Sequence, residues 1–165
     1  PGGRGRTPVR IIFDSQLRLS SDSMLVQTIA AGPVIIFCSQ LANAQAQIKL
    51  EKHGIEVVRL EQNAYGLDLT AALQWCAKRD LSSLLLEAGT RLNQSFYSAG
   101  LIDQIIHLST QKTLQSGVPG LLCDASRQTA LAFPRDTDYI KVRSCELAGD
   151  LLSIWQRANG MIGTP

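Results

Sequence analysis

The feature that most constrains this chain is an apolar run, a glycine turn and a helical pattern within residues 82–103. Three leucines at residues 84–86 lie between two serines and a Glu-Ala-Gly turn, which is typical of a strand buried on both faces of a sheet. Apolar residues then recur at helical spacing up to Gly100, so we expect a helix over residues 90–99. The unpaired N–H groups and the positive end of the dipole at the start of this helix would then bind an anion beside Glu87.

The preceding part of the chain repeats this alternation of strand and helix. We expect strands over residues 9–14, 33–38 and 55–60, and helices over residues 24–32, over residues 39–53 and from Asp68 onward. Together with a strand ending at Leu108, this order predicts a mostly parallel sheet with helices on both faces. After an irregular stretch containing Gly117 and Pro134, the Ala-Gly-Asp step at residues 148–150 predicts a C-terminal antiparallel hairpin.

Composition excludes several function classes. The 165 residues fit one domain, with 45% hydrophobic and 18% charged residues, which are near ordinary globular values. A net charge of +2 does not indicate a nucleic-acid binder, and no apolar span long enough for a membrane helix is present. The four cysteines form no C-x-x-C pair and only two histidines accompany them, so we expect no metal site and reduced thiols in a cytoplasmic protein.

The first eight residues form a glycine-rich, basic arm. Arg4, Arg6 and Arg10 have the charge to contact phosphates, but a solvated linker is the favoured interpretation. Because the chain starts at Pro1 rather than methionine, we expect either a processed N-terminus or a piece of a longer protein.

Two ordered segments carry a family resemblance. The segment LLEAGTRLNQSFYSAGLIDQIIHLSTQKTL resembles a strand, Val-Glu-Gly-Gly, a small helix, Ala-Gly-Leu-Val-Asp-Glu and a further strand. Upstream, TPVRIIFDSQLRLSSDSMLVQTI is similar to an Arg-Pro-Val-Arg-Val-Val-Leu-Asp-Ser-x-Leu-Arg opening. Both patterns belong to the reductase domain of the bifunctional riboflavin-biosynthesis deaminase/reductases.

This resemblance implies a dihydrofolate-reductase-like α/β fold, a three-layer α-β-α arrangement with a C-terminal antiparallel hairpin. The chain lacks the family's Ala-Ser-Leu-Asp-Gly strand and the strand ending in Val-Gly-x-x-Thr-Val, so residues 9–158 are expected to be the C-terminal part of a reductase domain. It also lacks the deaminase zinc pattern, and the resemblance implies a deaminase domain covalently linked elsewhere. Exposed sheet edges favour a homodimer, and we expect a chain that is marginally stable or self-associates.

The resemblance implies NADPH as the cofactor, and we expect it to bind where the strands end. In open α/β sheets ligands bind outside the carboxyl ends of the strands, and here these ends carry Asp14, Ser15, Ser39 and the turn after residue 86. Ser15 and Arg18 could offer a hydroxyl and a guanidinium to the ribose 2′-phosphate. A solvent-facing Arg18 is the alternative.

The Gly89 turn is expected to take the cofactor's pyrophosphate on its N–H groups. Ala88 and Thr90 flank it and complete the predicted cofactor site. Ala88 replaces the first of the family's two glycines and Thr90 stands where the family often has proline, which makes a tight backbone approach to the ligand less certain here.

The resemblance implies reduction of the ribosyl group of 5-amino-6-(5-phosphoribosylamino)uracil to a ribitylamino product. Glu87, matched to the family's glutamate before the glycine turn, would contact the sugar or steady a cationic imine. The alternative is a helix-start carboxylate bonded by local N–H groups. Two other classes stay open: a nucleotide-binding regulatory module without turnover, and a dimerising domain that binds no nucleotide.

Overall fold

The computed structural model describes residues 7–64, 66–110 and 138–158. Most of the basic arm and the irregular stretch with Gly117 and Pro134 lie outside these ranges. Contacts between residues divide the chain into two compact units, residues 1–83 and residues 84–165.

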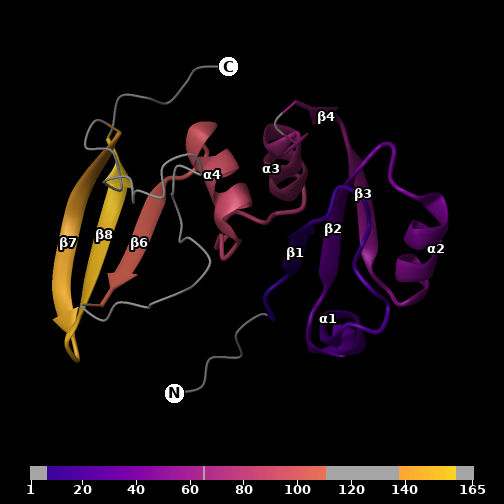
Figure 1. Cartoon of the computed structure of the whole chain (residues 1–165), viewed down its shortest axis with the longest axis horizontal. Helices are drawn as coiled ribbons and strands as arrows, with labels where there is room; N and C mark the ends of the chain where they lie inside the picture. Colours follow the sequence, from indigo (N-terminus) through magenta and orange to yellow (C-terminus); the bar gives the residue numbers. More distant parts are fainter. Residues whose placement is uncertain (1–6, 65, 111–137, 159–165) are drawn as a thin grey trace, which may run out of the picture. The chain divides into compact units, whose positions relative to one another are not determined.

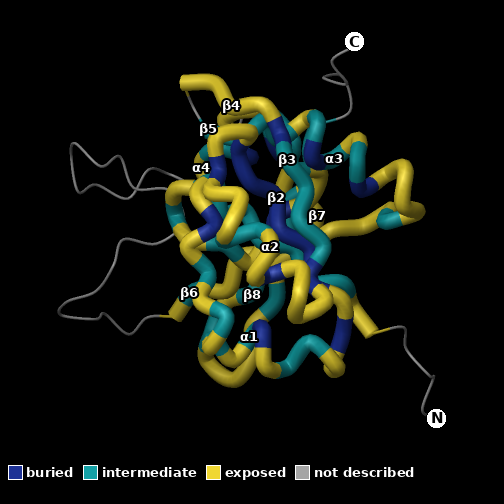
Figure 2. The backbone as a smooth tube through the Cα atoms, turned by 90° about the vertical axis from the view of Figure 1, so that its right-hand side faces the viewer, coloured by how far each residue is buried: buried dark blue, intermediate teal, exposed yellow. Residues whose placement is uncertain are grey.

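The first unit is built on a three-stranded parallel sheet. Its strands are β1 (Arg10–Phe13), β2 (Val34–Ser39) and β3 (Glu56–Leu60), in the order β1-β2-β3 (Figure 1). All six residues of β2 are buried, and β2 forms a dark core in Figure 2. The expected parallel strands of this half are confirmed. The central strand β2 is buried throughout because β-branched and apolar residues fill both of its faces.

One face of this sheet is covered by two helices. Val34, Ile36 and Cys38 of β2 form a core cluster with Val26 of α1 (Met24–Gln27) and Leu50 of α2 (Ala44–Lys52). Burial raises the pKa of the Cys38 thiol, and the Arg59 charge offsets this only in part.

The opposite face is covered by α3 (Leu69–Ala77). Ile35 and Phe37 pack there with Ala72 and Cys76, and the Phe37 ring lies 5.5 Å from the ring of Trp75. Helices on both sides of the sheet confirm the α-β-α layering within this unit.

Helix starts depend on single side chains. The Asn43 Oδ1 accepts hydrogen bonds from the N–H groups of Gln45 and Ala46 at 2.8 and 3.1 Å, so α2 begins at Ala44. The expectation of a helix from Ser39 is wrong because residues 39–42 form a separate turn. The Asp68 cap of α3 is confirmed, since its carboxylate accepts from the Ala71 N–H at 2.9 Å.

The expected helix over residues 24–32 divides into α1 and a 3-10 turn at Ile29–Ala31. The Arg10 guanidinium holds this segment, donating to the carbonyl oxygens of Thr28 at 2.9 Å and Gly32 at 2.6 Å. Arg10 is therefore part of the fold rather than a free cation for phosphates or solvent.

The segment after β3 forms a small sheet of its own. Gln62–Asn63 (β4) pairs antiparallel with Gly66–Leu67 (β5). A φ of +126° at Gly66 lets the chain reverse within a few residues.

The second unit contains α4 (Thr90–Ser98) and an antiparallel sheet. Its strands are β6 (Gln104–Ser109), β7 (Tyr139–Leu147) and β8 (Asp150–Arg157), in the order β6-β8-β7. The predicted C-terminal hairpin is confirmed. Its turn residues Ala148 and Gly149 have φ values of 51° and 92°, as a two-residue hairpin turn of type I′ requires.

Helix α4 contacts this sheet through aromatic rings. Tyr97 stacks on Tyr139 with ring centroids 5.6 Å apart, and the Tyr139 hydroxyl donates to the carbonyl oxygen of Ile102 at 2.8 Å. Burial raises the pKa of Tyr139. Gly100, expected as the helix stop, has φ +65°, a backbone state that favours glycine. A Cβ there would lie 2.7 Å from Arg157 Nη2, at the end of a flexible side chain, so the backbone rather than the space requires glycine.

The buried strand expected over residues 84–86 is not formed. This segment has no regular secondary structure, and the side chains of Leu84 and Leu85 are 44% and 79% exposed. A parallel strand forms only by hydrogen bonding to a neighbouring strand, and no described strand pairs with these residues. The glycine turn and the helix after it are present, but the strand before them is missing.

Candidate functional site

The carboxyl end of β1 leads into a loop fixed by its own residues. The Asp14 carboxylate accepts from the Leu19 N–H at 2.8 Å, and the Asp14 carbonyl oxygen accepts from the Leu17 N–H at 3.1 Å. Leu17 is buried with φ +54°, an uncommon backbone state for leucine. Asp14 therefore closes the loop, and its carboxylate is used within the protein.

Arg18 and Ser15 are the side chains that this loop leaves for a ligand. Arg18 lies between Leu17 and Leu19, which both belong to or pack against the core, so its own side chain is exposed. Within residues 7–64, 66–110 and 138–158, neither the Arg18 guanidinium nor the Ser15 hydroxyl has a hydrogen-bond partner. A free guanidinium and a free hydroxyl on one closed loop suit phosphate oxygens.

Ser39 joins this loop to the end of β2. Its N–H donates to the Ser15 carbonyl oxygen at 3.1 Å, and its hydroxyl accepts from the Leu41 N–H at 3.1 Å. The Ser39 side chain is buried. The structure therefore places Asp14, Ser15, Arg18 and Ser39 at the same edge of the parallel sheet, with Ser39 serving the loop's shape.

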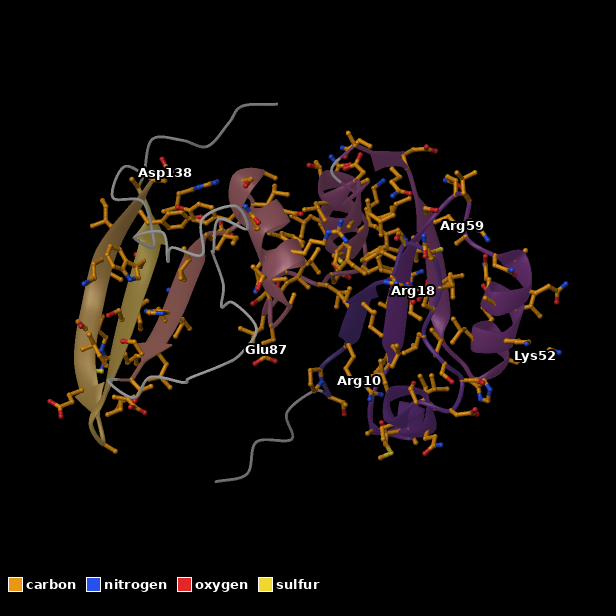
Figure 3. All side chains as sticks on the ribbon, in the orientation of Figure 1. Arg10, Arg18, Lys52, Arg59, Glu87 and Asp138 are labelled. Atoms are coloured by element: carbon orange, nitrogen blue, oxygen red, sulfur yellow. The ribbon has the colours of Figure 1, made fainter. Side chains whose placement is uncertain are left out.

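Arg59 was missed by the sequence reasoning, although it holds the loop after β2. Its guanidinium donates to the carbonyl oxygens of Gln40 at 2.6 Å and Ala42 at 3.0 Å, and its Nε donates to Gln47 Oε1 at 2.9 Å (Figure 3). A lone arginine near the end of a strand is the only sequence signal, and it does not identify acceptor oxygens 12 to 20 residues away.

In the second unit, the Glu-Ala-Gly turn precedes α4. Gly89 is the N-cap residue of α4 and brings no side chain to accept from the first-turn N–H groups. The Glu87 carboxylate is exposed and accepts no hydrogen bond from the described residues (Figure 3). The alternative of a carboxylate bonded by local N–H groups is thus without support in the geometry, and Glu87 is open to a ligand.

The backbone at Gly89 is neither crowded nor strained. A Cβ at Gly89 would meet no atom within 4 Å, and its φ of −70° is open to any residue. Ala88 is half-buried and its carbonyl oxygen accepts a hydrogen bond from the Asn93 side-chain amide. Thr90 is the first residue of α4. Neither backbone strain nor crowding within the described residues therefore requires glycine at this position.

The predicted site residues fall into two groups. Asp14, Ser15, Arg18 and Ser39 belong to the first unit, whereas Glu87 and its turn belong to the second. Their convergence on one nucleotide remains a prediction. Within the described part of the chain, no group of three or more His, Cys, Asp or Glu side chains could hold a metal ion, and no helix has the length and apolar character to cross a membrane.

Comparison with known proteins gives this arrangement its family. The model of the RibD C-terminal domain matches residues 1–132, a stretch that includes the β1 loop and the turn before α4. The chain belongs to the RibD C-terminal domain family. This result confirms the resemblance read from the two motifs.

Individual relatives agree with this assignment. The riboflavin biosynthesis protein RibD of Actinobacillus pleuropneumoniae is 32% identical over 100 residues, which cover 61% of this chain and 26% of that protein. A 2,5-diamino-6-ribosylamino-4(3H)-pyrimidinone 5′-phosphate reductase of Aquifex aeolicus is 30% identical over 107 residues, 64% of this chain and 46% of that protein. The chain thus spans less than half the length of these curated relatives.

Solved structures confirm the α/β fold. A pyrimidine reductase-like protein from Corynebacterium diphtheriae superposes with a TM-score of 0.71 at 16% identity, over 92% of this chain and 61% of that one. RibD of Acinetobacter baumannii superposes with a TM-score of 0.67 at 18% identity, over 90% of this chain and 37% of that one. At such identities the superpositions speak for the fold alone.

Proposed function

We propose that this RibD C-terminal domain takes part in the NADPH-dependent reduction of 5-amino-6-(5-phosphoribosylamino)uracil in riboflavin biosynthesis. The observation that carries this proposal is the family match over residues 1–132, which includes both loops described above. A named pyrimidinone phosphate reductase among the relatives supports the reaction class. Reduction of the ribosyl group opens the sugar and gives a ribitylamino product.

The residues present fit a phosphorylated nicotinamide nucleotide. Arg18 has a guanidinium without a described partner, and Gly89 starts α4 with open space outside the turn. A guanidinium binds phosphate oxygens with two parallel N–H groups, and a helix N-terminus binds anions through its N–H groups and dipole. In this proposal Ser15 and Arg18 bind the 2′-phosphate, and the N–H groups from Ala88 to Thr90 bind the pyrophosphate. Asp14 and Ser39 hold the loop that carries Arg18.

Bound NADPH would supply the hydride, and the protein would supply geometry and charge. That hydride would add to the sugar carbon of the ring-opened, protonated imine of the substrate, the electron pair of the C=N bond would move to the positively charged nitrogen to give the neutral amine, and the cofactor would leave as NADP⁺. The Glu87 carboxylate, exposed and without a described partner, binds the sugar hydroxyls or balances the positive charge of that imine.

The proposed partners follow from the relatives. We propose a covalently linked deaminase domain, as the bifunctional family has, together with a homodimer and a cytoplasmic location. These proposals can be checked on the full-length protein by its mass in solution and by its deaminase activity.

The direct test of the function is substrate-dependent consumption of NADPH by the full-length protein. We expect consumption only when the phosphoribosylamino-pyrimidine is present, with the ribitylamino compound as product. Binding of NADPH without any product would instead support a regulatory nucleotide-binding module. One observation favours that second candidate: Leu84 and Leu85 are exposed and pair with no described strand, so the strand expected to carry Glu87 at its end is not formed.

Replacing Arg18 by alanine should weaken NADPH binding by about 1.5–3 kcal/mol, because one charge-assisted phosphate interaction is lost. Binding of NADH, which lacks the 2′-phosphate, should remain within about 0.5 kcal/mol of the parent value. Calorimetric titration with both cofactors measures the difference.

The matched control is Lys52→Ala, which removes an exposed positive charge from the last turn of α2 in the same unit (Figure 3). It should change neither affinity. Equal weakening of both cofactors by Arg18→Ala would show that Arg18 does not contact the 2′-phosphate.

A further inference from the structure

Asn93 is a buried polar residue in α4 to which the proposed function assigns no role. Its side chain is 3% exposed, and its Nδ2 donates to the Ala88 carbonyl oxygen at 2.6 Å. Asparagine is a poor helix former because its amide competes for backbone groups. Here that amide reaches back to the turn that starts the helix.

The bond to Ala88 fixes the direction of the next N–H group. In a trans peptide the carbonyl oxygen and the following N–H point in opposite directions. When Asn93 holds the Ala88 oxygen inward, the Gly89 N–H must point away from Asn93. Gly89 is exposed, a Cβ there would meet nothing within 4 Å, and no described residue accepts from its N–H. The Gly89 N–H is therefore left without an acceptor among the described residues.

We propose that Asn93 is a positioning residue that orients the Ala88–Gly89 peptide, so that the Gly89 N–H, and not the Ala88 carbonyl, faces an anionic phosphate ligand. This inference rests on the proposed function, which assigns a phosphate to this turn. If the peptide turned over, a carbonyl oxygen would face the phosphate, and two negative oxygens repel each other. Asn93 itself does not contact the ligand.

The other half of the Asn93 amide supports a role beyond folding. Because Nδ2 must face the Ala88 carbonyl, Oδ1 is fixed on the opposite side, where it is buried and has no partner among the described residues. A buried acceptor without a donor lowers stability. The buried, unbonded Oδ1 of Asn93 is thus an unfavourable group that accompanies the hydrogen bond from Nδ2 to Ala88.

The other nine-residue helices make a useful contrast. In α2 and α3 the side chains of Asn43 and Asp68 accept from first-turn N–H groups. In α4, Asn93 lies within the helix and its side chain donates to the Ala88 carbonyl oxygen before the helix start. The N-cap residue Gly89 provides no side chain to accept from the first-turn N–H groups. The start of α4 is therefore left open while its preceding peptide is held.

The test follows the Gly89 amide directly. In ¹⁵N-labelled full-length protein, titration with inorganic pyrophosphate should move the Gly89 amide resonance in a saturable manner. Asn93→Ala should weaken this binding about tenfold, a change of about 1.4 kcal/mol. Should that variant fold poorly, Asn93→Asp tests the same point, because an ionised carboxylate of the same shape cannot donate to Ala88.

The matched control is Ser95→Ala in the same helix. The Ser95 hydroxyl donates to the Arg91 carbonyl oxygen at 3.0 Å, so this change also removes a side chain to backbone bond, but not one on the turn. It should leave pyrophosphate binding at the parent value. An unchanged affinity in folded Asn93→Ala and Asn93→Asp would overturn the proposal.

Two further measurements separate this proposal from the proposed function. The ligand-free Cα and carbonyl chemical shifts of Ala88 and Gly89 report the peptide orientation, and they should change in the Asn93 variants but not in Ser95→Ala. Identical shifts in all proteins would overturn the positioning role whether or not a ligand binds. Asn93→Ala should keep most of the turnover rate at saturating NADPH and substrate, and it should raise the KM for NADPH. If the parent protein binds neither pyrophosphate nor NADPH, the phosphate site itself is overturned.

Discussion

Replacing Phe37 by alanine will lower the free energy of unfolding by about 3–5 kcal/mol, the usual cost of removing a buried aromatic ring. Phe37 is 0% exposed on the central strand β2. Its ring lies 5.2 Å from that of Phe13 and 5.5 Å from that of Trp75, so three elements of the first unit lose packing together. The urea midpoint, followed by tryptophan fluorescence and by circular dichroism, measures the loss.

Leu41→Ala provides the control, because Leu41 is 94% exposed in the turn that follows the same strand. Its unfolding free energy should stay within about 0.5 kcal/mol of the parent value. If Phe37→Ala lowered the free energy of unfolding by less than about 1 kcal/mol, the burial of Phe37 in the α-β-α core of the first unit would be contradicted.

Replacing Glu87 by glutamine will slow hydride transfer by about 100-fold and leave NADPH affinity nearly unchanged. Electrostatic stabilisation that acts mainly on the transition state changes the rate rather than ground-state binding. Glu87 is exposed, lacks a described partner and lies two residues before the N-cap of α4. Stopped-flow single turnover isolates the hydride step in the full-length protein.

Glu146→Gln on the exposed face of β7 removes a matched carboxylate from the same unit and should leave the rate unchanged. A scaffold carboxylate would give the opposite pattern at Glu87. The melting temperature would fall, in line with a helix-start interaction worth about 0.3–1 kcal/mol, while the hydride step kept its rate. That pattern would remove Glu87 from the site.

Local signals were sufficient for the parts of the fold that depend on neighbouring residues. The β-branched run ending at Cys38 predicted β2, Asp68 predicted the start of α3, and Ala148-Gly149 predicted the hairpin turn. Each relies on backbone preference, side-chain capping or burial pattern within about ten residues.

The failures depend on residues far apart in the sequence. Residues 84–86 have the composition of a buried strand, but a strand also needs an edge to pair with, and no described strand provides one. The helix after β2 starts late because Arg59 binds the carbonyls of the intervening turn. Similarly, the hydrogen bond between Ser15 and Ser39, which lie far apart in the sequence, becomes visible only when the chain is folded.

The measurement that most directly tests the proposed reductase function is transfer of deuterium from NADPH carrying the label at the reactive nicotinamide carbon. With the full-length protein and 5-amino-6-(5-phosphoribosylamino)uracil, mass spectrometry should find one deuterium at the first carbon of the ribityl chain. The same product should lack deuterium when unlabelled NADPH is supplied. If NADPH binds but the substrate is recovered with its ribosyl group intact, the domain is a nucleotide-binding module, and the proposed reduction is contradicted.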